Sequence, residues 1–229
     1  MNRYATILAV TTAAQIGAAS VAAAQGQVYD PLPPPGSAYV RFMNSLDGDL
    51  EVRPEFLPVQ SLGSTSANRV TSYFVVDKVA GRDLAAEIRG MNRVGHATFR
   101  VEPGTFINVI VQAGPGRDIV AVPVSDRTDF NQTRARLSFY NASPACPSAT
   151  LMLADGGTAV FQNIAPGTAK ARGVNPVETD VIASCDGHNA PALPLHGLGA
   201  GSMYSIWMMQ PGSEIVAFLT RDVTARWKP

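Results

Sequence analysis

An internal repeat runs through this chain and limits the architectures that it can adopt. The segment 38–44 (Ala-Tyr-Val-Arg-Phe-Met-Asn) is similar to 135–141 (Ala-Arg-Leu-Ser-Phe-Tyr-Asn), 97 residues later. The same shift relates 104–111 to 201–208. When segments near the start and near the end of two halves match at the same shift, the pattern is typical of a tandem duplication. The alternative is chance similarity between valine-rich strands. We therefore expect two similar domains.

Each half of the chain has the pattern of β-strands. Ile107, Val109 and Val111 alternate with their neighbours, so they share one face of a strand. Segments 70–79 and 119–124 are rich in β-branched residues, which favour strands. Proline and glycine turn signals separate these segments, and only 83–90 has the composition of a short helix.

This pattern predicts an all-β fold of two tandem β-sandwich domains, similar to immunoglobulin or carbohydrate-binding modules. The first domain is expected at 37–127 and the second at 134–229, with a linker at 128–133. Residues 25–36 include a run of prolines and form an extended lead-in to the first domain.

The first 24 residues have the features of a cleaved secretory signal peptide. Arg3 provides the positive charge, an alanine-rich apolar run follows, and Ala22-x-Ala24 is a small-residue cleavage pattern. Polar residues interrupt the run, which is short for a membrane-spanning helix. We expect an exported protein.

The two cysteines, Cys146 and Cys185, form an even pair in a chain that we expect to be exported, and this favours a disulfide. Two alternatives remain at this point. One is a metal site in which Cys185 joins Asp186, His188 and His196, and the other is a pair of free thiols.

Charge and motifs exclude several function classes. The chain has 18 basic and 18 acidic residues and no basic stripe, which argues against a nucleic-acid partner. It lacks the Gly-x-Ser-x-Gly motif of serine esterases, a phosphate-binding loop and a dinucleotide motif. We predict no catalytic residue, no cofactor and no metal.

Surface recognition is the remaining possibility, and four residues are its candidates: Trp207, Tyr39, Arg41 and Arg100. Trp207 lies on the strand face opposite the core-like face, where an aromatic ring either stacks on a sugar or packs between domains. The first half is rich in arginine, which favours contact with an acidic polymer.

The segment 28–44 (Val-Tyr-Asp-Pro-Leu-Pro-Pro-Pro-Gly-Ser-Ala-Tyr-Val-Arg-Phe-Met-Asn) resembles the start of the mature chain in the AlgF family of periplasmic alginate O-acetylation proteins. The segment 163–167 (Asn-Ile-Ala-Pro-Gly) adds to this resemblance, which extends to length, signal peptide and two β-domains. It implies a non-catalytic periplasmic adaptor in the O-acetylation of alginate or a similar polysaccharide.

The resemblance also implies partners. These are a periplasmic polysaccharide O-acetyltransferase, a membrane-bound acyltransferase that supplies acetyl groups, and the anionic polysaccharide itself. Three alternative functions stay open from the residues alone: a stand-alone carbohydrate-binding module, an immunoglobulin-like cell-surface module, and an esterase or transferase with an unrecognised site.

Overall fold

The structure is a computed structural model that describes residues 34–126, 131–176 and 178–227. Residues Pro31–Pro229 form one compact unit, and Met1–Asp30 lie outside the described residues. The predicted signal peptide (1–24), most of the lead-in (25–36) and part of the linker (128–133) therefore also lie outside them.

The first half of the described chain is built from two mainly antiparallel sheets, with strand orders β4-β1-β7-β8 and β3-β2-β5-β6. Its strands are β1 (Ala38–Asn44), β2 (Leu50–Pro54), β3 (Gln60–Leu62), β4 (Phe74–Val76), β5 (Asp83–Gly90), β6 (Arg93–Arg100), β7 (Phe106–Ala113) and β8 (Ile119–Asp126). Residues 83–90, the one segment whose composition allowed a short helix, instead form the strand β5, which pairs with β2 and β6.

The second half repeats this arrangement, with sheets β12-β9-β16-β17 and β11-β10-β13-β14, where β15 also pairs with β13. Its strands are β9 (Ala135–Asn141), β10 (Ala149–Leu153), β11 (Ala159–Ile164), β12 (Thr168–Val174), β13 (Thr179–Cys185), β14 (His188–Asn189), β15 (Leu193–Leu195), β16 (Met203–Met209) and β17 (Val216–Arg221).

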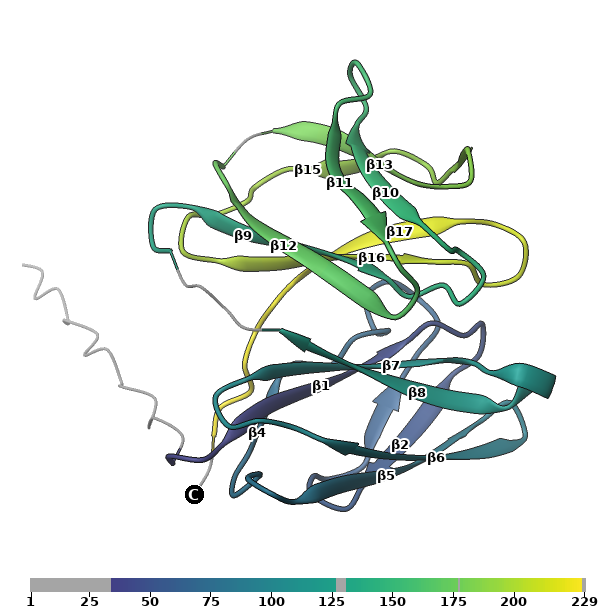
Figure 1. The fold of residues 1–229 in the computed structure, drawn as a ribbon, viewed down its shortest axis with the longest axis vertical. Coiled ribbons are helices and arrows are strands. Elements are labelled where there is room, and N and C mark those ends of the chain that lie inside the picture. Colours follow the sequence, from purple (N-terminus) through teal and green to yellow (C-terminus); the bar gives the residue numbers. More distant parts are fainter. Residues whose placement is uncertain (1–33, 127–130, 177, 228–229) are drawn as a thin grey trace, which may run out of the picture. The chain divides into compact units, whose positions relative to one another are not determined.

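The repeat in sequence is a repeat in topology. In each half the first strand pairs in parallel with a strand from the end of the half: β1 with β7, and β9 with β16. These equivalent pairs lie at the centres of equivalent sheets (Figure 1). The prediction of an all-β fold with tandem β-sandwiches is confirmed.

The central strands are buried on both faces, as is usual for parallel pairs. Val40 and Phe42 on β1, and Val109 on β7, face the hydrophobic core between the two sheets of the first half. A second core of the same kind fills the second half, with Phe139 and Ile206 among its members.

A third hydrophobic cluster joins the two halves. It uses the strand faces opposite the two cores, and its fully buried members include Met43 and Ile110 from the first half and Tyr140, Trp207 and Met209 from the second. The sheets β4-β1-β7-β8 and β12-β9-β16-β17 therefore pack against each other, which explains why both of their faces are apolar.

The segment after β17 returns to the first half. The backbone N–H of Tyr73 donates to the carbonyl of Val223 (2.8 Å), and the N–H of Ala225 donates to the carbonyl of Tyr73 (2.7 Å). Thr224 thus forms an isolated parallel bridge with Tyr73, directly before β4. Among the described residues, no helix has the length and apolarity needed to span a membrane.

Candidate functional site

Trp207 does not lie on the surface. Its side chain is fully buried and stacks on Tyr140, with ring centroids 4.2 Å apart and an interplanar angle of 19°. Its Nε1 donates a hydrogen bond to Thr220 Oγ1 (3.0 Å). This burial contradicts the predicted sugar-stacking surface and agrees with the alternative that Trp207 packs between the domains.

Arg41 is also buried, and its guanidinium is bound on every side. Its Nη1 donates to Asp222 Oδ1 (2.6 Å) and its Nη2 to Ser205 Oγ (2.7 Å), both in the second half. Its Nε donates to Asn108 Oδ1 (2.5 Å) in the first half. The predicted surface contact between Arg41 and an acidic polymer is therefore wrong, because the partner of Arg41 is internal.

Aromatic rings complete the enclosure of this guanidinium. The Cζ atom of Arg41 lies 4.2 Å from the ring centroid of Tyr73 and 5.0 Å from that of Trp207, within the range of cation–π contacts. The hydroxyl of Tyr73 donates to Asn108 Oδ1 (2.9 Å), and Asn108 Nδ2 donates to the Tyr140 hydroxyl (2.9 Å). We call the group Arg41, Asp222, Ser205, Asn108, Tyr73 and Tyr140 the buried polar network.

The protonation states in the buried polar network follow from burial and charge. Burial opposes the charge on Arg41, but Tyr73 and Asp222 outweigh this effect and raise the pKa of the guanidinium. Burial raises the pKa of Tyr140 to about 12 and that of Tyr73 well above its usual range. Arg41 therefore stays protonated and the two phenols stay neutral within one hydrogen-bonded group between the halves.

A second ion pair links the halves, with the arginine now in the second half and the aspartate in the first. Arg136 Nη2 on β9 contacts Asp126 Oδ1 at the end of β8 (2.7 Å), and Arg136 Nη1 donates to Ser138 Oγ (2.7 Å). In each case an arginine from the first strand of one half meets an aspartate from the end of the other half. Sequence reasoning identified neither aspartate as a partner, although both occupy equivalent places in the repeat.

The other two predicted binding residues lie outside this network. Tyr39 is half-buried, and its ring stacks on Phe106 with centroids 4.3 Å apart. Arg100 is exposed on β6 and forms an ion pair with Asp83 (2.7 Å). The structure thus brings Arg41 and Trp207 together and leaves Arg100 on a different sheet.

The predicted disulfide joins Cys146 and Cys185, with their Cα atoms 5.8 Å apart. Cys185 is therefore not available as a thiolate ligand, which removes the alternative metal site that included it. His196 lies 3.8 Å from Asp180 instead. Among the described residues, no three His, Cys, Asp or Glu side chains are gathered in a way that could hold a metal ion.

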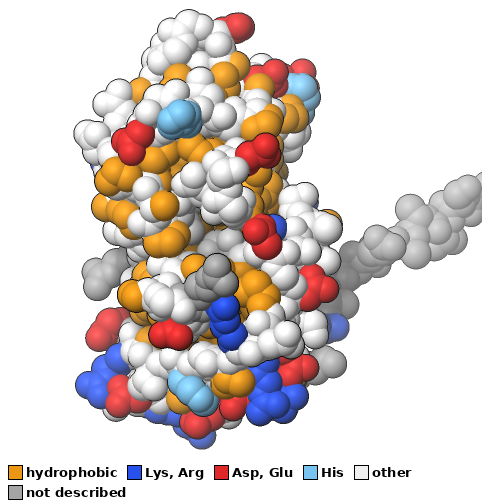
Figure 2. Space-filling view, turned by 90° about the vertical axis from the view of Figure 1, so that its right-hand side faces the viewer, with side chains coloured by type: hydrophobic (Ala, Val, Ile, Leu, Met, Phe, Trp, Pro, Cys, Tyr) orange, Lys and Arg blue, Asp and Glu red, His pale blue; other side chains and the backbone are white. Residues whose placement is uncertain are grey.

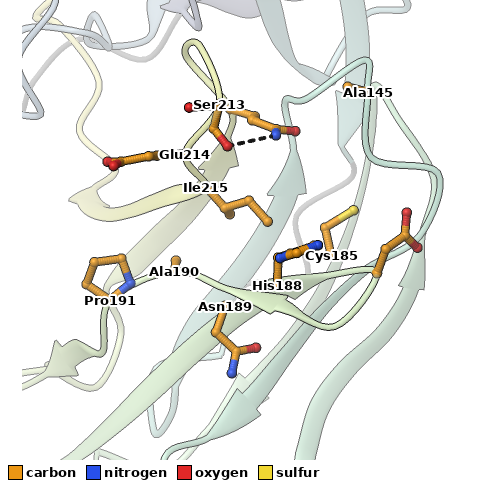
Figure 3. Close-up of a pocket in the computed structure, with 11 residues that line it drawn as sticks. Ala145, Cys185, His188, Asn189, Ala190, Pro191, Ser213, Glu214 and Ile215 are labelled. Atoms are coloured by element: carbon orange, nitrogen blue, oxygen red, sulfur yellow. Dashed lines mark hydrogen bonds between the residues drawn. The ribbon is translucent and has the colours of Figure 1, made fainter.

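A cavity of about 760 Å³ opens beside the disulfide (Figure 3). One wall comes from Asp186, in the turn after β13, and from His188 and Asn189 on β14. The turn between β16 and β17 contributes Ser213 and Glu214, which lie across the cavity from His188 in Figure 3. Its mixed lining offers donors and acceptors to a small polar group.

The chain was compared with known proteins. No family model matches it. It is 29% identical to the alginate biosynthesis protein AlgF of Pseudomonas aeruginosa (strain PAO1), over 98% of each chain. A solved structure of the C-terminal domain of AlgF from P. aeruginosa covers 39% of this chain and 98% of that domain, with 22% sequence identity and a TM-score of 0.35. The similarity to the curated protein spans both halves of the repeat, and it supports the resemblance of this chain to the AlgF family.

Proposed function

We propose that this chain is a non-catalytic adaptor in the biosynthesis of an exported polysaccharide, alginate or a similar polymer. The observation that carries this proposal is the similarity to alginate biosynthesis protein AlgF over 98% of each chain. Similarity over such a length concerns both β-sandwiches and their connection, and not one shared motif.

The adaptor would act at the O-acetylation step in the periplasm. It would couple a membrane-bound acyltransferase, which supplies acetyl groups, to the periplasmic acetyltransferase that transfers them to the polymer. Export through the expected signal peptide agrees with this location, and the resemblance of segment 28–44 to O-acetylation proteins agrees with this step.

The architecture supports a role in which surfaces are presented to partners. The buried polar network and the third hydrophobic cluster hold the two sandwiches in one unit. This leaves the sheet β3-β2-β5-β6 with a charged outer face, where Arg53 pairs with Glu51 (2.5 Å). Figure 2 shows charged side chains gathered around the first half, in the lower part of the view. Complementary charge on a partner gives specificity and speeds association.

Direct binding tests the adaptor role. The purified chain is immobilised, and a purified periplasmic O-acetyltransferase of the same polysaccharide system is passed over it. We expect saturable binding that weakens in a variant carrying Arg53→Glu and Arg89→Glu, since both side chains lie on the charged outer face. A chain that binds the polymer but not the transferase would contradict the adaptor role.

A second measurement addresses the alternative of an enzyme. The purified chain is assayed with a chromogenic acetyl ester, and we expect no turnover above the uncatalysed rate. Turnover that one point substitution abolishes would show that the chain is a catalyst and not an adaptor.

A further inference from the structure

The sequence contains two segments of the form Asn-x-Ser/Thr in which the middle residue is not proline. They are 131–133 (Asn-Gln-Thr), just before β9, and 141–143 (Asn-Ala-Ser), which begins at the last residue of β9. This form is the acceptor motif for N-glycosylation, which in exported proteins takes place on surface loops. The surroundings of each asparagine therefore decide whether its motif can be used.

The fold closes the motif at 141–143 to any enzyme. Asn141 has no exposed surface, and its Nδ2 donates to the carbonyls of Cys146 (2.8 Å) and Ile164 (2.9 Å). Both hydrogens of the amide are therefore used inside the second half. Asn44, its equivalent in the first half, makes the same kind of contacts without such a motif. The role of Asn141 is thus structural.

The motif at 131–133 lies on the surface. Asn131, Gln132 and Thr133 are all exposed, in the connection that leads into β9. The backbone N–H of Arg134 donates to the carbonyl of Asn131 (3.4 Å), so the four residues form a turn. Exposed turns between domains are the segments that modifying enzymes reach most easily.

The hydrogen bonds of the Asn131 side chain use its oxygen and not its nitrogen. Oδ1 accepts from the backbone N–H of Thr133 (2.9 Å) and from the hydroxyl of the same residue (2.8 Å). Among the described residues, no group accepts a hydrogen bond from Nδ2 of Asn131. The atom that would carry a glycan is thus free, and the hydroxyl that the motif requires lies against the same amide.

We propose that Asn131 is an acceptor for N-linked glycosylation by an oligosaccharyltransferase, with an oligosaccharide on a lipid diphosphate as the donor. Nδ2 of Asn131 attacks the anomeric carbon of the first sugar, and a carbon–nitrogen bond forms. The bond from this carbon to the diphosphate oxygen breaks, and the lipid diphosphate leaves with the electron pair. One amide proton passes to a base of the transferase. Oδ1 stays an acceptor, so both bonds from Thr133 are compatible with the product.

Three substitutions separate glycosylation from a role in the turn alone. Asparagine and aspartate both favour the first position of such a turn, so Asn131→Asp keeps the acceptor oxygen and removes only the amide nitrogen. Thr133→Ala keeps the amide and removes the hydroxyl of the motif. Thr133→Ser keeps the hydroxyl and is the matched control. The site requires export of the chain, which the features of residues 1–24 predict, and it does not depend on the adaptor role.

The test is glycosylation of the purified, folded chain with a purified bacterial oligosaccharyltransferase and its lipid-linked oligosaccharide. Trypsin cuts after arginine, so Asn131 lies in the peptide 128–134 and Asn141 in a different peptide. Mass spectrometry therefore reads the two asparagines separately. We expect the oligosaccharide on peptide 128–134 of the unmodified chain and of Thr133→Ser, and its loss in Asn131→Asp and Thr133→Ala. The peptide that contains Asn141 should stay unmodified in every chain.

A standard acceptor peptide in the same reaction shows that the enzyme and the donor are active, and thermal unfolding verifies that each variant is folded. Three results would overturn the proposal. The first is an unmodified peptide 128–134 in a reaction that modifies the standard peptide. The second is equal modification of Asn131 and Asn141, which would mean that the fold does not select the site. The third is a glycan that persists in Thr133→Ala, which would show attachment outside the motif.

Discussion

Arg41 is a charged residue with almost no exposed surface, and Asp222 supplies the opposing charge. In an Arg41→Met variant, the carboxylate of Asp222 stays buried without its ion-pair partner. Breaking a buried pair in this way costs about 3–5 kcal/mol. We therefore expect the free energy of unfolding, measured by chemical denaturation, to fall by about this amount.

The double variant Arg41→Met/Asp222→Asn is the control, because it removes both charges. It should recover part of the lost stability, since no unpaired charge stays buried. A loss below about 1 kcal/mol in the single variant would mean that the ion pair does not hold the halves together.

Tyr140 predicts a dependence of stability on pH. Burial raises its pKa to about 12, whereas an unfolded tyrosine titrates near 10. Its contribution is therefore fully present below pH ~10 and is lost as the pH rises through about 12, by about 3 kcal/mol in total. The raised pKa of Tyr73 acts in the same direction.

A comparison with Tyr140→Phe isolates this contribution. Other groups titrate above pH ~10 in both proteins, so the difference between the two pH profiles belongs to Tyr140. The variant should lose less stability than the unmodified chain between pH ~10 and ~12. Parallel profiles would show that the hydroxyl is not held neutral by the fold.

At the scale of the elements, the first strand of each half ends at an asparagine whose side-chain amide binds two backbone carbonyls. Asn44 Nδ2 donates to the carbonyls of Gly48 (2.8 Å) and Gly63 (2.9 Å). Asn141 makes an equivalent pair of bonds, at 2.8 and 2.9 Å, to carbonyls beyond β9 and at the end of β11. The repeat pointed to this equivalence, because the two asparagines are 97 residues apart in matching segments.

The disulfide fastens the segment before β10 to the end of β13. Its two cysteines are 39 residues apart and both buried. In the chain-entropy description, a closed loop of this size stabilises the fold by about 3–4 kcal/mol. We expect Cys146→Ala/Cys185→Ala to lose this amount in a denaturation experiment.

A reductant provides the control for this prediction. It should destabilise the unmodified chain by a similar amount and leave the double variant unchanged. An unmodified chain whose stability does not respond to full reduction of the disulfide would contradict the prediction.

Two elements show where sequence reasoning stops. Asp83–Gly90 contains alanine, leucine and glutamate, which favour helices, but pairing with β2 and β6 overrides this preference. For Trp207, strand alternation gave the correct face but not what covers it. The covering surface is the other half of the chain, which no local pattern describes.

In the whole molecule, residues after β17 fasten the second half to the first. Asp222 binds Arg41, and the backbone of Val223 and Ala225 pairs with Tyr73. A chain truncated after Arg221 lacks all of these contacts. We expect calorimetry to show two unfolding transitions in place of one cooperative transition, because the halves become less coupled.

The full-length chain, prepared and measured in the same way, controls for handling of the C-terminus. A truncated chain that unfolds in one transition at the original temperature would contradict the role of this segment. It would leave the third hydrophobic cluster as the sufficient connection between the halves.

The fold could be predicted at this scale, but the long-range contacts could not. The tandem sandwiches followed from the repeat and from strand periodicity. Arg41 and Asp222 are 181 residues apart, and Arg41 corresponds in the repeat to Ser138 and not to another arginine. The groove lined by Arg134 and Arg172 also needs the three-dimensional structure, because these two residues come from different segments.

The proposed place of this chain in polysaccharide O-acetylation is tested most directly in cells. The acetyl content of exopolysaccharide is measured by proton NMR in a strain that lacks the chain, beside the complemented strain. We predict loss of O-acetyl groups, with the yield of polymer intact and acetylation restored on complementation. Unchanged acetyl content in the strain that lacks the chain would contradict the proposed function.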